Sequence, residues 1–270
     1  MKPDDYSQGD AFQAEKRAIF SIENLPLCAE GQLVRPGDFV SGTVGGWGVV
    51  GVRGKDGAVR VLRNACRHQN MQVVSTPAGN CGTFRCRFHG WTYDLAGRFV
   101  SAPTPVAPKD PQSNDLHLTT LSSRVVSGLV YFSMTEGESF DVDIGPLAAY
   151  GGTLTTDIAC NWKVCVEHLL AEHAPSDDFV WSWPVLTVRR AGAVTIVQQV
   201  APHTFLRTRL LTHLFGSNVD DHGQAAATIK HVCEDLQADR AAGKPAIGGE
   251  LVDGFHRRLA EAYAKDAATT

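Results

Sequence analysis

The sequence predicts an α+β protein with two domains. The N-terminal domain, over residues 1–140, is expected to contain one helix near its start and otherwise only β-strands. An α+β domain follows over residues 141–270. Three observations support this division: short apolar runs separated by turn signals fill residues 35–132, a Pro-rich segment interrupts them, and longer helix and strand patterns begin after Glu136.

Composition limits the possible classes of function. The 270 residues are 43% hydrophobic, and 25 basic and 29 acidic side chains are spread along the chain with a formal net charge of -4. We therefore expect neither nucleic acid nor a membrane surface as a partner. The N-terminus lacks a signal-peptide pattern and no eighteen apolar residues run together, so a cytoplasmic location is expected.

The seven cysteines predict no disulfide framework in a reducing compartment. Two of them belong to the motif described below. The others are expected to be packing residues: Cys28, Cys81, Cys160, Cys165 and Cys233.

In the first domain, mixed charges at helical spacing predict a helix over residues 8–24. Apolar runs at 49–53 and 59–62 flank Lys55-Asp56-Gly57 and predict a hairpin. Further short strands are expected at 83–85, 91–94 and 98–100, and a single returning strand at 125–132. Four prolines make residues 101–113 an extended connection.

In the second domain, the pattern predicts a helix from about Asp157 to His173 and two long strands at 194–200 and 207–215. Two more helices are expected over 224–241 and 250–265. No internal repeat is present.

Two short motifs in the first domain carry the candidate chemistry. Cys66-Arg67-His68 and Cys86-Arg87-Phe88-His89 each combine one thiol with one imidazole. A Rieske [2Fe-2S] centre holds one iron by two thiolates and the other by two imidazoles, so this inventory suits such a cluster. One tetrahedral zinc could use the same four side chains, but zinc fingers usually group the two cysteines and the two histidines separately.

The sequence around these motifs resembles that of the Rieske-type, ring-hydroxylating oxygenases. The resemblance extends from Asn64-Ala65-Cys66-Arg67-His68 through His89-Gly90-Trp91 to Asn161-Trp162-Lys163 and Glu167. It implies an N-terminal Rieske domain followed by an oxygenase-like, helix-grip domain. It also implies that Cys66 and Cys86 hold one iron, that His68 and His89 hold the other, and that Trp91 packs beneath the loops.

One feature of the family is missing from the second domain. Such proteins hold a mononuclear iron by two histidines and one carboxylate. Counted from Asn161, the expected histidine positions are occupied by Ala174 or Pro175 and by Phe179 or Val180. The chain is also shorter than the family's usual α subunit, and its substrate pocket is expected to be lost. We therefore predict that this chain holds no mononuclear Fe(II).

An atypical iron site remains an alternative, formed by His168, His173 and Asp235. On one continuous helix, the five-residue step between these histidines turns about 140° and rises about 7.5 Å, so both could reach one iron only if the helix broke between them. Pro175 predicts a break after His173 instead. Structural roles are therefore favoured for both histidines, and a solvated position is favoured for Asp235.

The leading interpretation is a Rieske subunit of a multicomponent oxygenase. It would accept electrons from an NAD(P)H-dependent reductase or ferredoxin and pass them to a mononuclear iron in a companion subunit. Because the resemblance implies that one subunit's cluster serves its neighbour's iron, a trimer or hetero-oligomer is expected. The alternatives are a self-contained mono- or dioxygenase with the atypical iron site and a free Rieske electron carrier.

Overall fold

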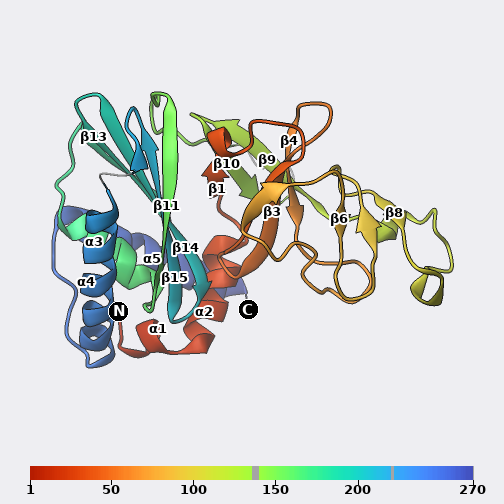
Figure 1. Ribbon diagram of the computed structural model, residues 1–270. Helices are drawn as coiled ribbons and strands as arrows, with labels where there is room; N and C mark the ends of the chain where they lie inside the picture. The colour runs from red at the N-terminus through yellow and green to blue at the C-terminus, as the bar shows by residue number, and fades with distance from the viewer. Residues whose placement is uncertain (136–139, 220–221, 270) are drawn as a thin grey trace. The chain divides into compact units, whose positions relative to one another are not determined.

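The computed structural model describes residues 1–135, 140–219 and 222–269, and it confirms the α+β class. The chain divides into two compact units (Figure 1). One unit contains residues 26–140, and the other combines Met1–Leu25 with Asp141–Thr270. The change of unit at 140/141 falls where the sequence changes character. The first 25 residues, expected to belong with the N-terminal domain, instead fold with the C-terminal part of the chain.

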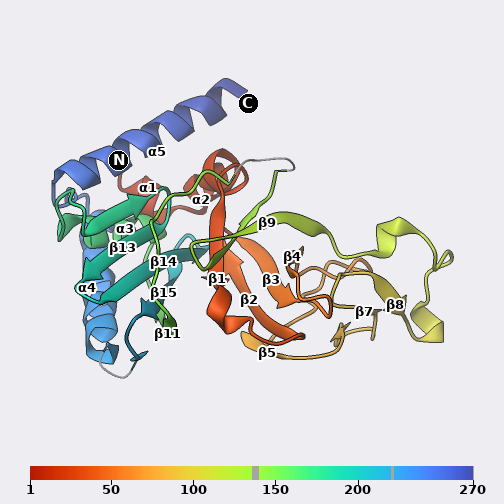
Figure 2. The same cartoon turned by 90° about the horizontal axis from the view of Figure 1, so that it is seen from above.

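The unit of residues 26–140 is built from two antiparallel sheets. The larger sheet has the strand order β1-β10-β9-β4-β3-β2-β5, and the smaller has the order β6-β7-β8. The strands of the larger sheet are β1 (Leu25–Ala29), β2 (Asp38–Val44), β3 (Trp47–Arg53), β4 (Val59–Arg63), β5 (Ala78–Asn80), β9 (Thr120–Val126) and β10 (Leu129–Ser133). Those of the smaller sheet are β6 (Phe84–Arg85), β7 (Thr92–Tyr93) and β8 (Phe99–Ser101). Figure 2 shows the extended connection between β8 and β9, which contains the four prolines and two short 3₁₀ turns.

The predicted hairpin is present as β3 and β4, which pair antiparallel from Val49 with Arg63 to Arg53 with Val59. The predicted single strand at 125–132 is wrong. It is a second hairpin, β9–β10, in which Ser127 (φ 48°) and Gly128 (φ 75°) form the turn. Two consecutive left-handed residues suit the tight turn of a two-residue hairpin, but an apolar run on both sides hides that turn in the sequence.

The other unit has a five-stranded antiparallel sheet in the order β11-β15-β14-β13-β12. Its strands are β11 (Tyr150–Ile158), β12 (Phe179–Ser182), β13 (Leu186–Ala191), β14 (Val194–Thr204) and β15 (Arg207–Phe215). Its long helices are α3 (Trp162–Ala171), α4 (Gly223–Ala241) and α5 (Glu250–Thr269). Helix α3 packs on β14 and β15 and contacts both α4 and α5, so it lies in the core of the unit.

The helix predicted over 157–173 is therefore too long at both ends. Residues up to Ile158 belong to β11, and the Asn161 side chain caps the helix by accepting a hydrogen bond from the Lys163 amide. The helix ends at Ala171, between the two histidines. The helix predicted over 8–24 is present as α2 (Gly9–Glu15), which continues directly into a π-helical turn over Lys16–Phe20. A separate short helix, α1 (Asp4–Ser7), precedes it. No helix among the described residues is both long and apolar enough to cross a membrane.

Candidate iron–sulfur site

The first candidate loop leaves β4 and is closed by one side chain. Asn64 is 4% exposed, and its amide oxygen accepts hydrogen bonds from the Val73 and Val74 amides at 3.0 and 2.9 Å. Its amide nitrogen donates to the Val74 carbonyl at 2.8 Å. Asn64 therefore fastens the two ends of the loop that contains Cys66 and His68.

Within this loop the backbone wraps around Cys66. The Cys66 amide donates to the Met71 carbonyl at 2.8 Å, and the Cys66 carbonyl accepts from the Asn70 amide at 2.7 Å. Asn70 has φ 56°, in the left-handed region. Asparagine is one of the few residues other than glycine that adopt this conformation readily.

The second loop, between β6 and β7, repeats this arrangement. The Cys86 amide donates to the Trp91 carbonyl at 2.8 Å, and the Cys86 carbonyl accepts from the Gly90 amide at 2.9 Å. Gly90 has φ 72°, so it corresponds to the left-handed asparagine of the first loop. Two loops of the same local geometry thus present one cysteine and one histidine each.

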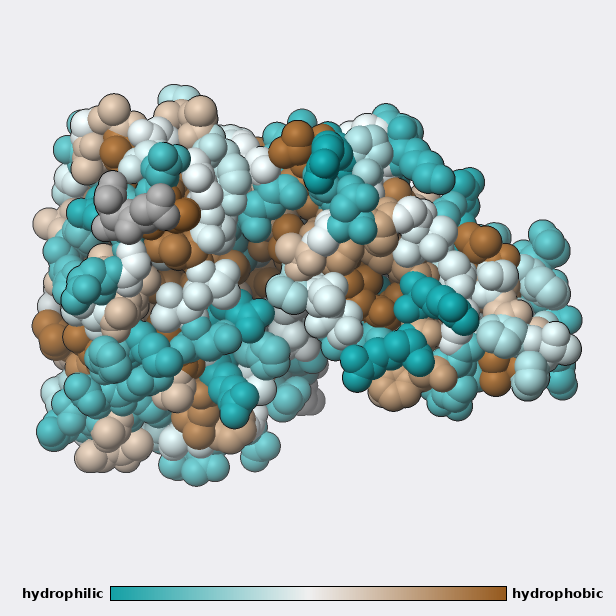
Figure 3. Space-filling view, viewed as in Figure 1, coloured by the Kyte–Doolittle hydropathy of each residue, from teal (hydrophilic) through white to brown (hydrophobic). Residues whose placement is uncertain are grey.

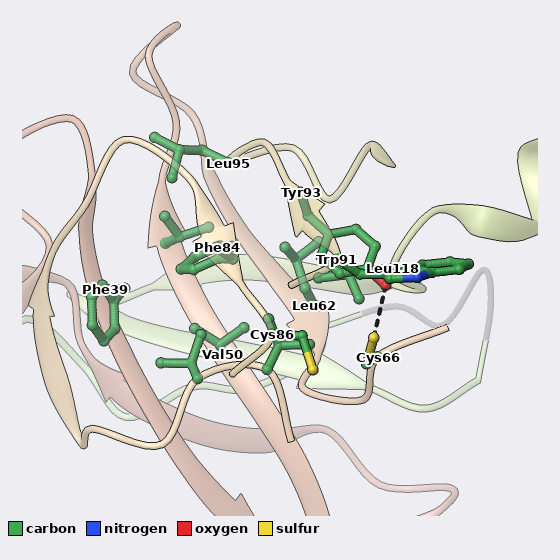
Figure 4. Packing of buried hydrophobic residues seen from close by; sticks show 13 residues of the cluster. Phe39, Val50, Leu62, Cys66, Phe84, Cys86, Trp91, Tyr93, Leu95 and Leu118 are labelled. Carbon is green, nitrogen blue, oxygen red and sulfur yellow. Dashed lines mark hydrogen bonds between the residues drawn. The ribbon is translucent and has the colours of Figure 1, made fainter. Parts of the chain in front are cut away.

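The four predicted ligands come together at these loops. The rings of His68 and His89 lie 4.7 Å apart and nearly perpendicular, and Cys66 and Cys86 are 1% and 2% exposed. Figure 4 shows both sulfur atoms in the core of this unit, and the two thiols interact with each other. Nδ1 of His68 is buried and has no hydrogen-bond partner among the described residues. A buried, unpartnered imidazole nitrogen beside two thiols fits a metal ligand.

The arrangement favours a two-iron cluster over a single zinc ion. Within the described ranges, no three His, Cys, Asp or Glu side chains surround one point closely enough to hold a single metal ion. The donors instead form a buried cysteine pair and a histidine pair. A two-iron cluster needs this pairing, whereas tetrahedral zinc needs all four donors around one atom.

Tyr93 contacts the cysteine side of the site. Its hydroxyl lies 3.1 Å from Cys66 Sγ (Figure 4). The hydroxyl also accepts a hydrogen bond from the Arg67 amide at 3.1 Å. The hydroxyl proton is therefore left to point at the sulfur. Burial raises the pKa of both the Cys66 thiol and the Tyr93 hydroxyl, so a thiolate here needs a cation to compensate its charge.

Trp91 supports the histidine side. Its ring stacks on His68 at 5.0 Å with an interplanar angle of 9°, and its Nε1 donates to the Val106 carbonyl at 2.9 Å. Val106 belongs to the Pro-rich connection, which explains why this segment follows a fixed extended path. Cys81 packs against the same core and burial raises the pKa of its thiol.

The second unit contains the residues of the alternative iron site, but the structure does not bring all three together. His168, 8% exposed, and His173 line one cavity of about 310 Å³ between α3, α4 and the sheet. Asp235 is exposed on α4 and does not line it. Other residues that line this cavity include Glu172, Arg189, Gln198, Thr212, His222 and Ile229.

This cavity corrects two expectations. A pocket is present where the sequence predicted its loss, and the end of α3 at Ala171 places the helix break between His168 and His173. The two imidazoles nevertheless have different surroundings. His168 Nε2 lies 3.9 Å from Glu172 Oε1, whereas His173 stacks on Phe179 at 4.1 Å. Burial lowers the pKa of both histidines.

Asn161-Trp162-Lys163 and Glu167, which contribute to the family resemblance, have structural roles here. Buried Glu15 of α2 accepts hydrogen bonds from Trp162 Nε1 at 2.6 Å and from Tyr263 of α5 at 2.7 Å, and it forms an ion pair with Lys163. The motif therefore attaches both the N-terminal segment and the last helix to α3.

Glu167 makes a second attachment one turn further along α3. It accepts hydrogen bonds from Tyr6 at 2.5 Å and Arg240 at 2.9 Å, and it lies 2.8 Å from His256 Nε2. Hydrogen bonds from these partners outweigh the effect of burial and lower the pKa of Glu167. Sequence reasoning did not identify these partners, because they are far from α3 in the chain.

Comparison with known proteins agrees with this geometry. Residues 23–121 match the family model of the Rieske [2Fe-2S] domain. The chain is 31% identical over 180 residues to the chlorobenzene dioxygenase α subunit of Cupriavidus sp. (strain PS12), and 31% identical over 190 residues to a benzene 1,2-dioxygenase α subunit of Pseudomonas putida. These alignments cover 60% and 64% of this chain but only 40% and 42% of the relatives. The chain thus spans about two fifths of the length of the curated relatives that it matches.

Solved structures show the same fold over most of the chain. The quaternary ammonium Rieske monooxygenase CntA, in complex with gamma-butyrobetaine, has a TM-score of 0.79 at 18% identity, with 97% of this chain and 95% of that chain covered. Another CntA structure is described as giving insights into inter-subunit electron transfer. Naphthalene 1,2-dioxygenase with bound indole has a TM-score of 0.67 at 16% identity, with 91% and 80% covered. The chain therefore contains a Rieske [2Fe-2S] domain followed by an oxygenase-like domain, and it is homologous to the α subunits of ring-hydroxylating dioxygenases.

Proposed function

We propose that this chain is the Rieske subunit of a multicomponent oxygenase. It accepts electrons from an NAD(P)H-dependent reductase or ferredoxin and passes them to a mononuclear iron in a partner subunit. The observation that carries the proposal is the pair of matched loops, which present Cys66 with Cys86 and His68 with His89. These four residues would hold the [2Fe-2S] cluster.

When bound, a Rieske cluster supplies a one-electron carrier whose potential is raised by its neutral imidazole ligands. The surrounding residues of this chain have defined tasks. The left-handed residues Asn70 and Gly90 shape the two loops, Tyr93 directs its hydroxyl proton at Cys66, and Trp91 fixes the plane of the His68 ring. Such neighbours hold the ligands in place and adjust the electron density on them.

The second unit supports delivery to another subunit. The two family histidine positions are occupied by Ala174 or Pro175 and by Phe179 or Val180, and Phe179 is buried and stacks on His173. None of these side chains ligates iron, and Asp235 is exposed outside the cavity. An oxygenase-like domain without its ligand set can still position the Rieske domain within an oligomer. A trimer or a hetero-oligomer with a companion subunit fits this role.

A self-contained mono- or dioxygenase is the second candidate function, because His168 and His173 line one cavity. Iron at this position would need a third donor from the cavity, and the carboxylate of Glu172, which lines it, lies 3.9 Å from His168 Nε2. A free electron carrier is less favoured, since residues 141–270 would have no task in it.

Reconstitution tests the proposal. The purified chain, with reductase, is expected to turn over no substrate alone and to support turnover after addition of an oxygenase subunit that contains an intact iron triad. His168→Ala and His173→Ala should leave the assembled complex active, whereas His89→Cys should stop electron delivery. Turnover by the chain alone that is lost in His168→Ala would contradict the proposal and support the second candidate.

A further inference from the structure

Three cysteines of the second unit come together in its core. Cys160 lies between β11 and α3, Cys165 lies on α3, and Cys233 lies on α4. The Cys233 thiol interacts with both of the others, and each of the three residues is 0% exposed. Figure 3 shows only small hydrophobic areas between hydrophilic ones on the face that it presents, as expected when such groups lie inside. Because Cys233 is far from the other two in the sequence, spacing did not predict this three-thiol site.

Hydrogen bonds hold the backbone around Cys160 against α4. The Ala159 amide donates to Glu234 Oε1 at 3.0 Å, and the Asn161 amide donates to Gln237 Oε1 at 2.8 Å. The residues before and after Cys160 are therefore both fixed to the stretch of α4 that supplies its thiol partner. Two thiols held in contact in this way are prepared to form a bond with little movement of the chain.

The surroundings of these thiols favour a neutral product over a charged one. The hydrogen bond with Cys233 and burial raise the pKa of the Cys160 thiol, so a thiolate that binds a metal ion is costly here. Among the described residues, no three His, Cys, Asp or Glu side chains are arranged to hold one metal ion. A disulfide carries no charge and avoids the cost of burying an ion. Oxidation to a disulfide is thus the reaction that this environment suits best.

A cavity of about 270 Å³ lies beside the three-thiol site. Its lining includes Ala159 and Glu234, which are the sequence neighbours of Cys160 and Cys233. A water molecule takes up about 30 Å³ in the liquid, so this cavity holds a molecule of the size of hydrogen peroxide with room to spare. A small oxidant in the cavity is therefore separated from the thiols by the width of one residue.

We propose that Cys160 and Cys233 form a site of reversible oxidation, with Cys165 as a second partner for Cys233. The co-reactant is a small two-electron oxidant of the peroxide class. One sulfur attacks a peroxide oxygen and the O–O bond breaks, which gives a sulfenic acid and one water. The second thiol displaces the hydroxyl group of the sulfenic acid, so that a sulfur–sulfur bond forms and a second water leaves. A dithiol restores both thiols by exchange and is itself oxidised to a disulfide.

The new bond would connect α4 to the chain just before α3. Helix α4 supplies Ile229 and Val232 to the wall of the cavity that His168 and His173 also line. A disulfide restricts the open and unfolded states of the segments that it joins, so oxidation would fix this wall. The inference goes beyond the proposed function, because none of these residues belongs to the iron–sulfur site.

Peptide mapping of the holoprotein tests the proposal. The protein is treated with a small molar excess of hydrogen peroxide, and catalase ends the reaction. It is then denatured in a mildly acidic buffer with N-ethylmaleimide, which blocks free thiols, and it is digested without reductant for mass spectrometry. The variants are Cys160→Ala and Cys233→Ala, and the matched control is Cys28→Ala, which removes a buried cysteine of the other unit. Visible absorbance before and after treatment reports on the iron–sulfur cluster separately.

The wild type should give peptides linked through Cys160 and Cys233, with the loss of two hydrogen atoms, and dithiothreitol should restore both thiols. Cys160→Ala should redirect the link to Cys165 and Cys233, whereas Cys233→Ala should give no link in this unit. Cys28→Ala should behave like the wild type. Hydrogen exchange of the α4 amides should slow at least about tenfold when the wild type is oxidised, and it should not change in Cys233→Ala.

Three results would overturn the proposal. The first is that all three thiols of the wild type stay free or are oxidised only to sulfinic acids, a result that needs no variant to fold. The second is that the purified protein contains stoichiometric copper or zinc that is lost in Cys233→Ala, which would make the three thiols a metal site. The third is that the disulfide forms while hydrogen exchange of α4 stays the same, which would remove the effect on the cavity wall.

Discussion

Two pairs of histidines in this chain differ in their surroundings. His68 and His89 come from two loops of matched geometry, and their rings lie 4.7 Å apart. His168 and His173 lie at the end of one helix, where one faces Glu172 and the other stacks on Phe179. The first pair is presented on loops that also carry two buried thiols, whereas the described lining of the cavity that His168 and His173 share contains no cysteine. The whole donor set, and not the spacing of two histidines, distinguishes a metal site from a pair of packing residues.

The first region, the two loops that carry Cys66, His68, Cys86 and His89, gives the largest expected effect when one of its thiols is removed. Cys86→Ser should abolish the visible absorbance of the Rieske cluster, because a hydroxyl is a poor substitute for a thiolate on ferric iron. Cys81→Ser is the matched control, since Cys81 packs against the same core and is not one of the four predicted ligands. A wild-type spectrum in Cys86→Ser would contradict the ligand assignment.

In the second region, which is α3 and its neighbours around His168 and His173, the buried Lys163–Glu15 ion pair should contribute more to the free energy of unfolding than the two histidines. Lys163→Met leaves Glu15 buried without its cation and should lower the free energy of unfolding by about 3 kcal/mol. Lys244→Met removes an exposed partner of Asp239 and should cost less than about 1 kcal/mol. Urea unfolding measures both. Equal losses would show that Asn161-Trp162-Lys163 does not fasten the terminal helices to α3.

Protonation of a buried histidine gives a pH-dependent prediction for the same region. His213 of β15 is fully buried between Thr153 (2.7 Å) and Gln199 (3.2 Å), and burial lowers its pKa to about 4. Between pH 6.5 and 4 the unfolded chain binds the proton more readily, so stability should fall as pH falls through this range, by up to about 3 kcal/mol.

The His213→Gln variant should lose less stability than the wild type between pH 6.5 and 4. Exposed His231→Gln is the control and should follow the wild type. Parallel curves for the wild type and His213→Gln would mean that another group causes the acid sensitivity.

A smaller effect is expected at the cysteine side of the first region. Tyr93→Phe removes the hydroxyl next to Cys66 Sγ and should lower the midpoint potential by a few tens of millivolts, because the sulfur then keeps more electron density. Tyr131→Phe is the control, since that buried hydroxyl has no partner among the described residues. An unchanged potential in Tyr93→Phe would show that the hydroxyl does not act on the cluster.

The sequence predicted most strands around His68 and His89 because the signals for them are local. In each loop, the cysteine and the histidine are only two or three residues apart in the sequence. The turn at Lys55-Asp56-Gly57 marks the hairpin that precedes the first loop. The β9–β10 turn was missed, since Ser127-Gly128 interrupts an apolar run without an Asn or Asp signal. Tyr93 and Asn64 act through hydrogen bonds that no spacing rule records.

The second region depends on contacts between distant parts of the chain. Glu15 of α2 finds its partners on α3 and α5, and Glu167 of α3 finds its partners on α1, α4 and α5. The sequence therefore could not show that residues 1–25 fold with the C-terminal part. The cavity beside His168 likewise forms between α3, α4 and three strands. Its presence, which the sequence did not predict, is the reason that the second candidate function deserves a direct measurement.

The number of iron atoms per chain tests the central claim most directly. The holoprotein, purified with its native partners removed, is analysed for iron and acid-labile sulfide against quantitative amino-acid analysis. The account predicts about two irons and two sulfides per chain, unchanged in the His168→Ala/His173→Ala double variant. About three irons per chain, with one of them lost in the double variant, would contradict it and would make this chain an oxygenase with its own iron site.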